Sequence, residues 1–461
     1  MRNQSPRAQS HQDTWDPETE NAETLKVFLA RYKSNPRPIS VNFRQIVPQI
    51  PYNSERASHY IHSYPAKLLL HIPHFFIANS LLSKPHDTVA DPFCGSGTVL
   101  LEAVMAGRNA LGTDTNPLAC LVAKVKTTPL DPKCLKRILQ SLSCSVVRQK
   151  DDRVPDVVNI THWFYPHVTK QLAKLKRAIE LIPDASYRDF FWVCFSSCVR
   201  KVSLSDPRIS VPVRLRTDTY PEGHALRSAS LKGLKDLKRV NVFECFTTIT
   251  EANISRIGNL YNLTRSTRAI VSLSDARSIN STARENRVGI SLIVTSPPYA
   301  GAQKYVRASS LSLGWLDLCG SQKLRSLEDN SIGREHYRKN EHQELVCTRI
   351  PKADQLLKRI YREYPLRAHI AGNYLLEMRA ALESMVKSLN PGGYIVLVAG
   401  NNYVCRHPFK TGEYLKQILC ELGLTPRLEL IDTIKSRGLM TKRNATANLI
   451  TREAVMLFQK T

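Results

Sequence analysis

The 461-residue sequence contains no apolar run of about 18 residues, the minimum for a membrane-spanning helix. Its first residues are polar and lack the apolar segment of a secretion signal. None of the 11 cysteines forms a C-x-x-C pair, and Cys194 and Cys198 have no second Cys/His pair to complete a zinc site. We therefore expect a cytoplasmic protein with free thiols, no bound metal and no contact with membranes.

Acidic residues are scarce relative to basic ones. The chain has 40 Asp and Glu against 65 Lys and Arg, which gives a formal net charge of +25. An excess of this size favours a polyanionic partner, most often nucleic acid, although a solvated basic surface is the simpler alternative. The hydrophobic fraction of 42% is ordinary for a globular protein, and the length predicts two or three domains or one large domain with an insertion.

The hydrophobic pattern predicts an α/β protein. A helix is expected from Ala66 to Leu82, followed by a short strand at 87–90, a glycine-rich turn, a helix and a second strand at 110–114. This order is the first half of a doubly wound, Rossmann-like sheet. Strands resume at 269–273 and continue to the C-terminus, whereas the residues between are mostly helical and basic.

We therefore expect four parts. They are a loose polar N-terminal arm (1–55), the first part of the α/β domain (56–125), a helical basic insertion (126–268), and the second part of the α/β domain (269–461) with a polar, substrate-facing segment at 320–365.

The strongest local signal is the turn from Asp91 to Thr98, Asp-Pro-Phe-Cys-Gly-Ser-Gly-Thr, at a strand end. Gly95 and Gly97 allow a ligand to approach the backbone closely. The acid at position 91 would repel a phosphate but suits an ammonium group, and Asp114 at the next strand end is placed for two ribose hydroxyls. Together these residues indicate S-adenosylmethionine, a nucleoside cofactor with an amine and no phosphate.

The second signal is Thr295-Ser-Pro-Pro-Tyr299, again at a strand end. Two prolines fix the backbone, and the Ser296 hydroxyl and the Pro297 carbonyl can accept hydrogen bonds from an exocyclic amino group. Tyr299 offers a ring on which an extrahelical base can stack. The alternative, a proline turn with a buried tyrosine, is weakened by the nearby glycine-rich turn.

These motifs resemble those of the amino-group DNA methyltransferases, which methylate exocyclic nitrogens of cytosine or adenine. Ser-Pro-Pro-Tyr is similar to the form typical of the N4-cytosine enzymes, whereas N6-adenine enzymes usually carry Asp or Asn in place of Ser296. Asn390-Pro-Gly-Gly-Tyr394 resembles the turn before the family's fifth strand. The resemblance covers about 58–125 and 269–461.

The resemblance implies the following roles. The catalytic residues would be Ser296, Pro297, Pro298 and Tyr299. The cofactor-binding residues would be Tyr64, Lys67, Asp91, Phe93, Gly95, Gly97, Thr98, Asp114 and Asp275. Asp275 belongs to the segment whose acid contacts the amino group of the cofactor's adenine.

Double-stranded DNA is the expected partner. Candidate contacts are Arg208, Arg214 and Arg216 in the insertion, and Tyr305 and Arg307 after the catalytic turn. The resemblance implies that the part that recognises the target sequence stands between the two motifs. Here the insertion precedes Asp275, so residues 320–365 are a second candidate for that role. The resemblance also implies a restriction–modification system with a cognate nuclease.

The expected reaction is S-adenosylmethionine-dependent methylation of an exocyclic amino group, giving N4-methylcytosine. Cytosine-C5 chemistry is disfavoured because its Pro-Cys nucleophile is absent at Pro297-Pro298. The alternatives are an adenine-N6 enzyme, then an RNA guanine-N2 methyltransferase, then a DNA-binding protein with an inactive methyltransferase fold.

Overall fold

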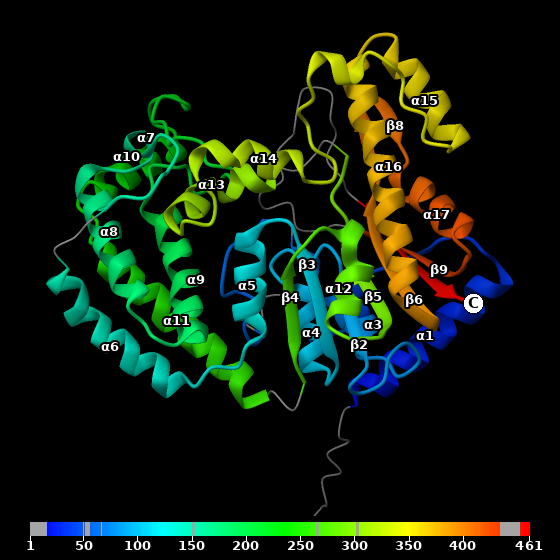
Figure 1. Ribbon diagram of the computed structural model, residues 1–461, viewed down its shortest axis with the longest axis horizontal. Helices are drawn as coiled ribbons and strands as arrows, with labels where there is room; N and C mark the ends of the chain where they lie inside the picture. Colours follow the sequence, from blue (N-terminus) through cyan, green and yellow to red (C-terminus); the bar gives the residue numbers. More distant parts are fainter. Residues whose placement is uncertain are drawn as a thin grey trace, which may run out of the picture.

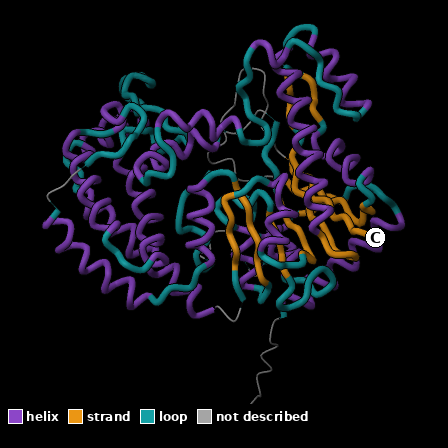
Figure 2. The backbone as a smooth tube through the Cα atoms, in the orientation of Figure 1, coloured by secondary structure: helices purple, strands orange, loops and turns teal. Residues whose placement is uncertain are grey.

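The computed structural model describes residues 16–48, 50, 56–65, 67–149, 153–263, 267–300, 304–433 and 452–461. Its centre is an eight-stranded sheet in the order β1-β9-β10-β6-β5-β2-β3-β4 (Figures 1 and 2). All neighbouring strands are parallel except β10, which runs antiparallel to both β6 and β9. The predicted α/β class with a doubly wound sheet is confirmed.

The strands of this sheet are β1 (Ile39–Val41), β2 (Thr88–Asp91), β3 (Asn109–Asp114), β4 (Ala269–Leu273), β5 (Ile290–Thr295), β6 (Leu389–Gly400), β9 (Leu424–Thr433) and β10 (Arg452–Lys460). A separate hairpin joins β7 (Asn402–Val404) to β8 (His407–Phe409).

Helices cover both faces of the sheet, and consecutive strand residues alternate between them. Ala90 and Ile293 pack into one apolar cluster, and Val89 and Leu292 pack into another on the opposite face. The first face is covered by α12 (Ile279–Glu285), α16 (Pro365–Ser388) and α17 (Thr411–Glu421). The other is covered by α1 (Pro17–Ser34), α2 (Phe43–Ile46), α3 (His71–Ile77) and α4 (Thr98–Met105).

The remaining α-helices are α5 (Pro117–Thr127), α6 (Pro132–Arg148), α7 (Ile160–Trp163), α8 (Pro166–Glu180), α9 (Ala185–Val202), α10 (Ala225–Leu237), α11 (Val242–Leu263), α13 (Tyr305–Trp315), α14 (Leu324–Asp329) and α15 (Pro351–Tyr361). Short 3-10 helices are η1 (Ala276–Ser278), η2 (Ser321–Lys323) and η3 (Lys339–His342). No helix among the described residues is long and apolar enough to cross a membrane.

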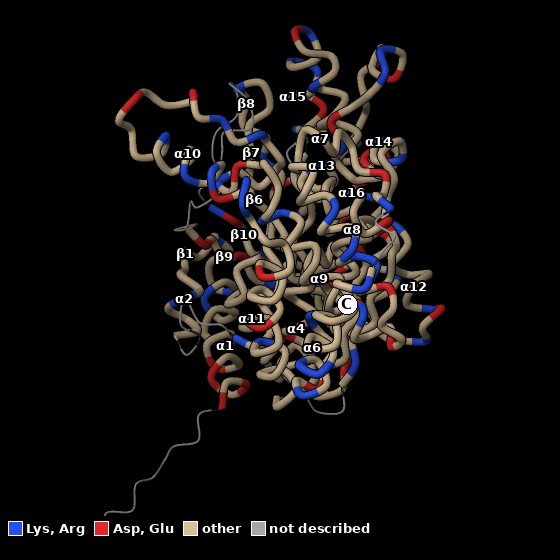
Figure 3. Tube along the Cα trace, turned by 90° about the vertical axis from the view of Figure 1, so that its left-hand side faces the viewer, with Lys and Arg blue, Asp and Glu red and all other residues tan. Residues whose placement is uncertain are grey.

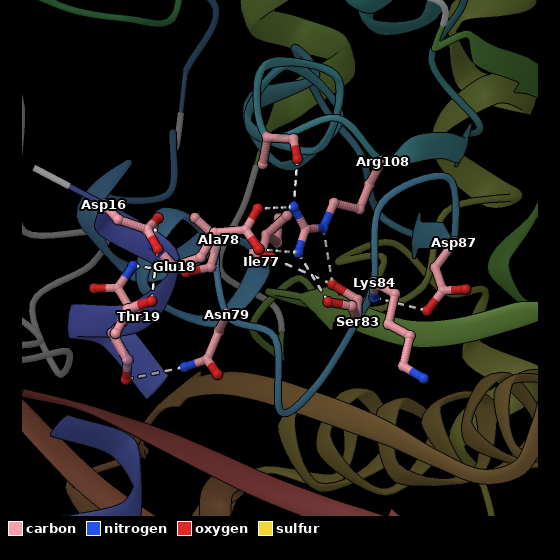
Figure 4. Close-up of polar contacts among 12 residues, drawn as sticks. Asp16, Glu18, Thr19, Ile77, Ala78, Asn79, Ser83, Lys84, Asp87 and Arg108 are labelled. Carbon is pink, nitrogen blue, oxygen red and sulfur yellow. Dashed lines mark hydrogen bonds and ion pairs between the residues drawn. The ribbon is translucent and has the colours of Figure 1, made fainter. Parts of the chain in front are cut away.

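The expectation of a loose arm over 1–55 is wrong for its described part. Helix α1 begins at the Asp16 cap, buries Leu25 and Tyr32 against the sheet, and is followed by β1, which pairs with β9. The fully buried Arg108 holds α1 in place by pairing with the Glu18 carboxylate and donating a 2.8 Å hydrogen bond to the Ser83 carbonyl (Figure 4). Although the segment is polar overall, α1 carries a narrow apolar stripe that is sufficient for it to pack on the sheet.

The helix predicted from Ala66 to Leu82 is shorter in the structure. Ala66 lies outside the described residues, and α3 spans only His71–Ile77. Pro73 explains the late start, because proline lacks an N–H and is tolerated only in the first turn of a helix. The segment before α3 is instead fixed by Lys67, whose ammonium donates to the His62 carbonyl at 2.6 Å.

The range of the predicted insertion contains helices α6 to α11, on the left of Figure 1. Its core also takes in α13, the helix that follows the Pro-Pro-Tyr turn. Trp315 at the end of α13 is fully buried, with its ring centroid 5.7 Å from that of Phe164 and 6.1 Å from that of Phe195. The insertion is therefore packed directly against the helix that follows the Pro-Pro-Tyr turn.

The polar segment 320–365 divides into two structural parts. Its second half forms α15, whose residues Leu357 and Ile360 are buried in the same apolar cluster as α16. Its first half contains α14, and the residues after α14 face the Pro-Pro-Tyr turn. Only this first half lies beside the Pro-Pro-Tyr turn, and the substrate-facing role of the segment stays a prediction.

Candidate functional site

The candidate site lies at the carboxyl edge of the parallel strands. Asp91 ends β2, Asp114 ends β3 and Thr295 ends β5, and β2 lies between the other two strands. Strands β2, β3 and β4 follow one another toward one edge of the sheet, whereas β5 and β6 lie on the other side of β2. The strand order therefore reverses between β2 and β5. Such a switch point is where open α/β sheets bind ligands.

The turn after β2 depends on its two glycines. Gly95 and Gly97 both have positive φ, +48° and +76°, which side chains on L-residues rarely permit. A Cβ atom on Gly97 would also lie 2.9 Å from the Cα of Ala123 in α5. Gly97 therefore lets α4 begin close to α5, and Thr98 becomes its first residue.

Asp91 is buried, and one of its two carboxylate oxygens accepts no hydrogen bond from any described residue. Its Oδ1 accepts hydrogen bonds from Thr295 Oγ1 at 2.6 Å and from the Phe93 amide at 3.1 Å. Its Oδ2 has no hydrogen-bond partner within the described ranges. Burial raises the pKa of Asp91 to about 7, because no cation compensates its charge. The arrangement suits a cationic ligand.

Asp114 holds the glycine turn from the side of β3. Its two oxygens accept hydrogen bonds from the Gly95 amide at 2.9 Å and from the Asn116 amide at 2.8 Å. Burial raises its pKa to about 6. The carboxylate lies beside the turn, and its remaining lone pairs can accept hydrogen bonds from a diol.

Tyr64 closes the other side of the turn. Its ring lies against Gly95, where an added Cβ would be 3.8 Å from a ring carbon, and its hydroxyl accepts from the Asn116 side chain at 3.2 Å. The same amide reaches Ser309 Oγ in α13, also at 3.2 Å. Asn116 therefore connects the glycine turn to α13, the helix that follows the Ser296–Tyr299 turn.

Two predicted cofactor residues have protein partners. The Lys67 ammonium binds the carbonyls of His59 and His62, and burial lowers its pKa to about 8. Both oxygens of Asp275 accept hydrogen bonds from the Arg277 guanidinium, at 2.9 and 2.7 Å. The roles of these residues toward a cofactor remain predictions.

The Ser296–Tyr299 turn continues directly from β5. Within the described part of the chain, no hydrogen bond engages the Ser296 hydroxyl, which leaves it open to a ligand. The Tyr299 hydroxyl donates a 2.9 Å hydrogen bond to Glu453 Oε1 at the start of β10. Burial raises the pKa of Glu453. This contact fixes the orientation of the Tyr299 ring.

A pocket opens beside this turn. It is lined by Pro298, Tyr299, Lys304, Tyr305, Val306, Arg307 and by residues 328, 329 and 331–336. Tyr305 and Arg307, predicted to contact the target nucleotide, therefore share a pocket with Tyr299. Residues after α14 form its opposite wall, so the first half of 320–365 is placed beside the predicted catalytic residues.

The three arginines predicted to bind DNA have partners within the insertion. Arg208 pairs with Asp206 at 2.6 Å, and Arg216 pairs with Asp218 at 2.6 Å. Arg214 donates to the His162 carbonyl. Their role in DNA binding stays a prediction, and for Arg208 and Arg216 a phosphate would have to compete with a neighbouring carboxylate.

Comparison with known proteins agrees with the geometry. Residues 1–125 match the DNA methylase family of N6 and N4 methyltransferases. Over these residues the chain is similar to that family. The type II methyltransferase M.MvaI of Kocuria varians is 34% identical over 161 residues, 33% of this chain and 36% of that protein. The type II methyltransferase M.BsoBI of Geobacillus stearothermophilus is 23% identical over 269 residues, 53% of this chain and 50% of that protein.

The matched parts thus span about a third to a half of these curated relatives. Among solved structures, the rRNA methyltransferase aviRa from Streptomyces viridochromogenes aligns with 91% of this chain and 96% of its own length. Its sequence identity is 11% and its TM-score 0.31, and a likeness that weak carries no inference about function.

Three residues of the site were not predicted from the sequence. Thr295 holds Asp91, Asn116 links Tyr64 to Ser309, and Glu453 holds Tyr299. Thr295 precedes a recognisable motif by one residue and Asn116 follows Asp114 by two. Glu453 carries no local signal, because its partner is distant in sequence.

Proposed function

We propose that the chain is an S-adenosylmethionine-dependent DNA methyltransferase that modifies the exocyclic amino group of a base in a duplex site. The observation that carries this proposal is the convergence of Asp91, Asp114 and the Ser296–Tyr299 turn at one switch point of the sheet. Residues 56–125 and 269–461 would form the catalytic part, with target recognition shared between 126–268 and 320–365.

The residues present fit the cofactor. The free Oδ2 of Asp91 would bind the ammonium group, and a cation there removes the cost of burying the carboxylate. Asp114 would accept the ribose hydroxyls while it holds Gly95. When bound, the cofactor supplies an activated methyl group on a sulfonium.

The catalytic turn would act on the target base. An exocyclic amine is a weak nucleophile, because its lone pair is delocalised into the ring. Hydrogen bonds from its protons to Ser296 Oγ and the Pro297 carbonyl would localise that lone pair on nitrogen. The Tyr299 ring, held by Glu453, would stack on the base and hold the nitrogen in line with the methyl group.

We assign the product as N4-methylcytosine, since Ser rather than Asp or Asn opens the tetrapeptide. The names of the curated relatives, type II methyltransferases, support a role in a restriction–modification system, where methylation protects host DNA from a cognate nuclease. N6-methyladenine is the alternative product, because both kinds of acceptor can bind an amine.

The test is mass spectrometry of nucleosides from the DNA and RNA of cells that express the chain. We expect N4-methylcytosine in DNA, less of it with Ser296→Ala, and none in cells with an empty vector. N6-methyladenine would overturn the assigned base. Methylated nucleosides in RNA alone would overturn the DNA substrate, and none in either would overturn the proposed activity.

A further inference from the structure

A second pocket lies on the insertion, away from the catalytic edge. It is formed by the end of α6, the first half of α8 and the turn between α10 and α11. Its lining residues are Val146, His167, Gln171, Lys174, Lys238, Arg239, Val240, Asn241 and Phe243. These helices form the left side of the molecule in Figure 1, the side that faces the viewer in Figure 3.

The cations of this pocket have no counter-charge. Lys174, Lys238 and Arg239 make no ion pair with any described residue, and no acidic residue is among those that line the pocket. On α8, Lys176 and Arg177 are by contrast paired with the Glu180 carboxylate, Arg177 at 3.0 Å. Asp236, the nearest acid in sequence to Lys238 and Arg239, is not among the lining residues, and Glu244 accepts a hydrogen bond from the Asn241 amide.

The polar groups around these cations are suited to an oxyanion. The Gln171 carbonyl oxygen accepts from the Val242 amide at 2.8 Å, so the polar atom that this side chain has left is its donor nitrogen. The Nε2 of His167 is buried without a partner. Unneutralised like charges held close together repel one another, and an anion between them removes that repulsion.

We propose that this pocket binds backbone phosphates of duplex DNA outside the base pairs being modified. The inference rests on the proposed function, because it takes the polyanion to be the substrate DNA. All residues that line the pocket belong to the insertion, whereas Tyr299 follows β5. Contacts with phosphates carry no sequence information, so they would be independent of the target sequence. The pocket would add affinity and salt dependence.

The experiment removes the three cations together, as Lys174→Gln, Lys238→Gln and Arg239→Gln in one protein. The matched control is Lys26→Gln, Lys33→Gln and Arg37→Gln. It removes three exposed cations in and just after α1 that pair with no described acid, and it gives the same change in net charge. Binding of a labelled, random-sequence duplex of about 40 base pairs is followed by fluorescence anisotropy over a range of salt concentrations.

The pocket variant should bind DNA about tenfold more weakly near 0.1 M salt, and its slope of log K against log salt should fall by about one for each lost phosphate contact. The control should change neither quantity appreciably. A pocket variant equal to the control would overturn the proposal. So would a result in which millimolar inorganic phosphate binds the pocket while DNA affinity is unaffected by the substitutions.

The same experiment distinguishes failure of the phosphate site from failure of the proposed function. S-adenosylmethionine affinity, measured by calorimetry, should be equal in the wild-type and pocket variants, because the pocket lies outside the cofactor turn. A wild-type protein that binds no DNA would overturn the proposed function itself. If the wild-type protein binds DNA and the pocket variant binds it equally well, only the proposed phosphate site would be overturned.

Discussion

The sheet edge and the insertion pocket hold unbalanced charge of opposite sign. At the sheet edge, the carboxylates of Asp91 and Asp114 form no ion pair with any described cation. At the pocket, Lys174, Lys238 and Arg239 form no ion pair with any acid that the structure describes. In each place the missing charge would come from a ligand, a cationic cofactor at the first and a polyanion at the second.

Burial differs between the sheet edge and the pocket, so the electrostatic effects of their charges differ in strength. Asp91 is 4% exposed and its pKa is raised to about 7, so its charge is costly until a cation binds. Lys238 and Arg239 are exposed, and water and salt screen them. We therefore expect single substitutions to matter greatly at the sheet edge, and only combined substitutions to matter at the pocket.

The largest effect is expected for Asp91→Asn. This change keeps the acceptor for Thr295 but removes the charge that would meet the cofactor's ammonium. A charge-assisted hydrogen bond contributes about 1.5–3 kcal/mol, so S-adenosylmethionine affinity should fall roughly 10- to 150-fold in calorimetry. Unchanged affinity in a folded variant would contradict the charge role assigned to the sheet edge.

The next effect concerns Tyr299. Tyr299→Ala should weaken capture of the extrahelical base by about 1–3 kcal/mol, the usual contribution of a base–aromatic stack. Tyr299→Phe keeps the ring, and Glu453→Gln keeps a hydrogen-bond partner for the hydroxyl, so both should retain most of the activity. The measurement is kcat/KM together with fluorescence of 2-aminopurine at the target position. Equal losses in the Ala and Phe variants would refute stacking.

A third effect is the pH dependence of cofactor binding. The ionised form of Asp91 binds the cation, and its pKa in the free protein is about 7. The dissociation constant should therefore rise about tenfold per pH unit as pH falls below 7, and level off above it. Asp91→Asn should lose this slope, whereas a wild-type protein with flat binding between pH 5.5 and 7 would show that Asp91 is not the titrating group.

The catalytic half could be predicted because its chemistry is local. A strand, a glycine turn and an acid stand next to one another in sequence, and parallel strands bring their carboxyl ends to one edge. The ends of β2, β3 and β5, which carry Asp91, Asp114 and Ser296, therefore lie at one edge of the sheet. The fold of 17–47 was missed because α1 buries few apolar residues, and its tie to Arg108 spans 90 positions of sequence.

The insertion carried no motif, so composition was the only guide. Composition counts cations but does not show which of them face acids. The sequence pointed to Arg208 and Arg216, whose carboxylate partners stand two positions away, at Asp206 and Asp218. The unpaired cations come together only when α6, α8 and the turn after α10 pack, which no local pattern predicts.

The smallest effect is therefore expected at Arg216. Arg216 and Asp218 are both largely exposed, 67% and 65%, and together they add no net charge to the surface. Replacing both, as Arg216→Gln with Asp218→Asn, should leave DNA affinity within about twofold, because exposed ion pairs contribute little and the local charge is unchanged. Anisotropy on the same duplex as for the pocket variant makes the comparison direct. A tenfold loss of DNA affinity in this double variant would mean that Arg216 leaves Asp218 to bind phosphate. An ion pair in the free protein would then not distinguish the cations that bind DNA from those that do not.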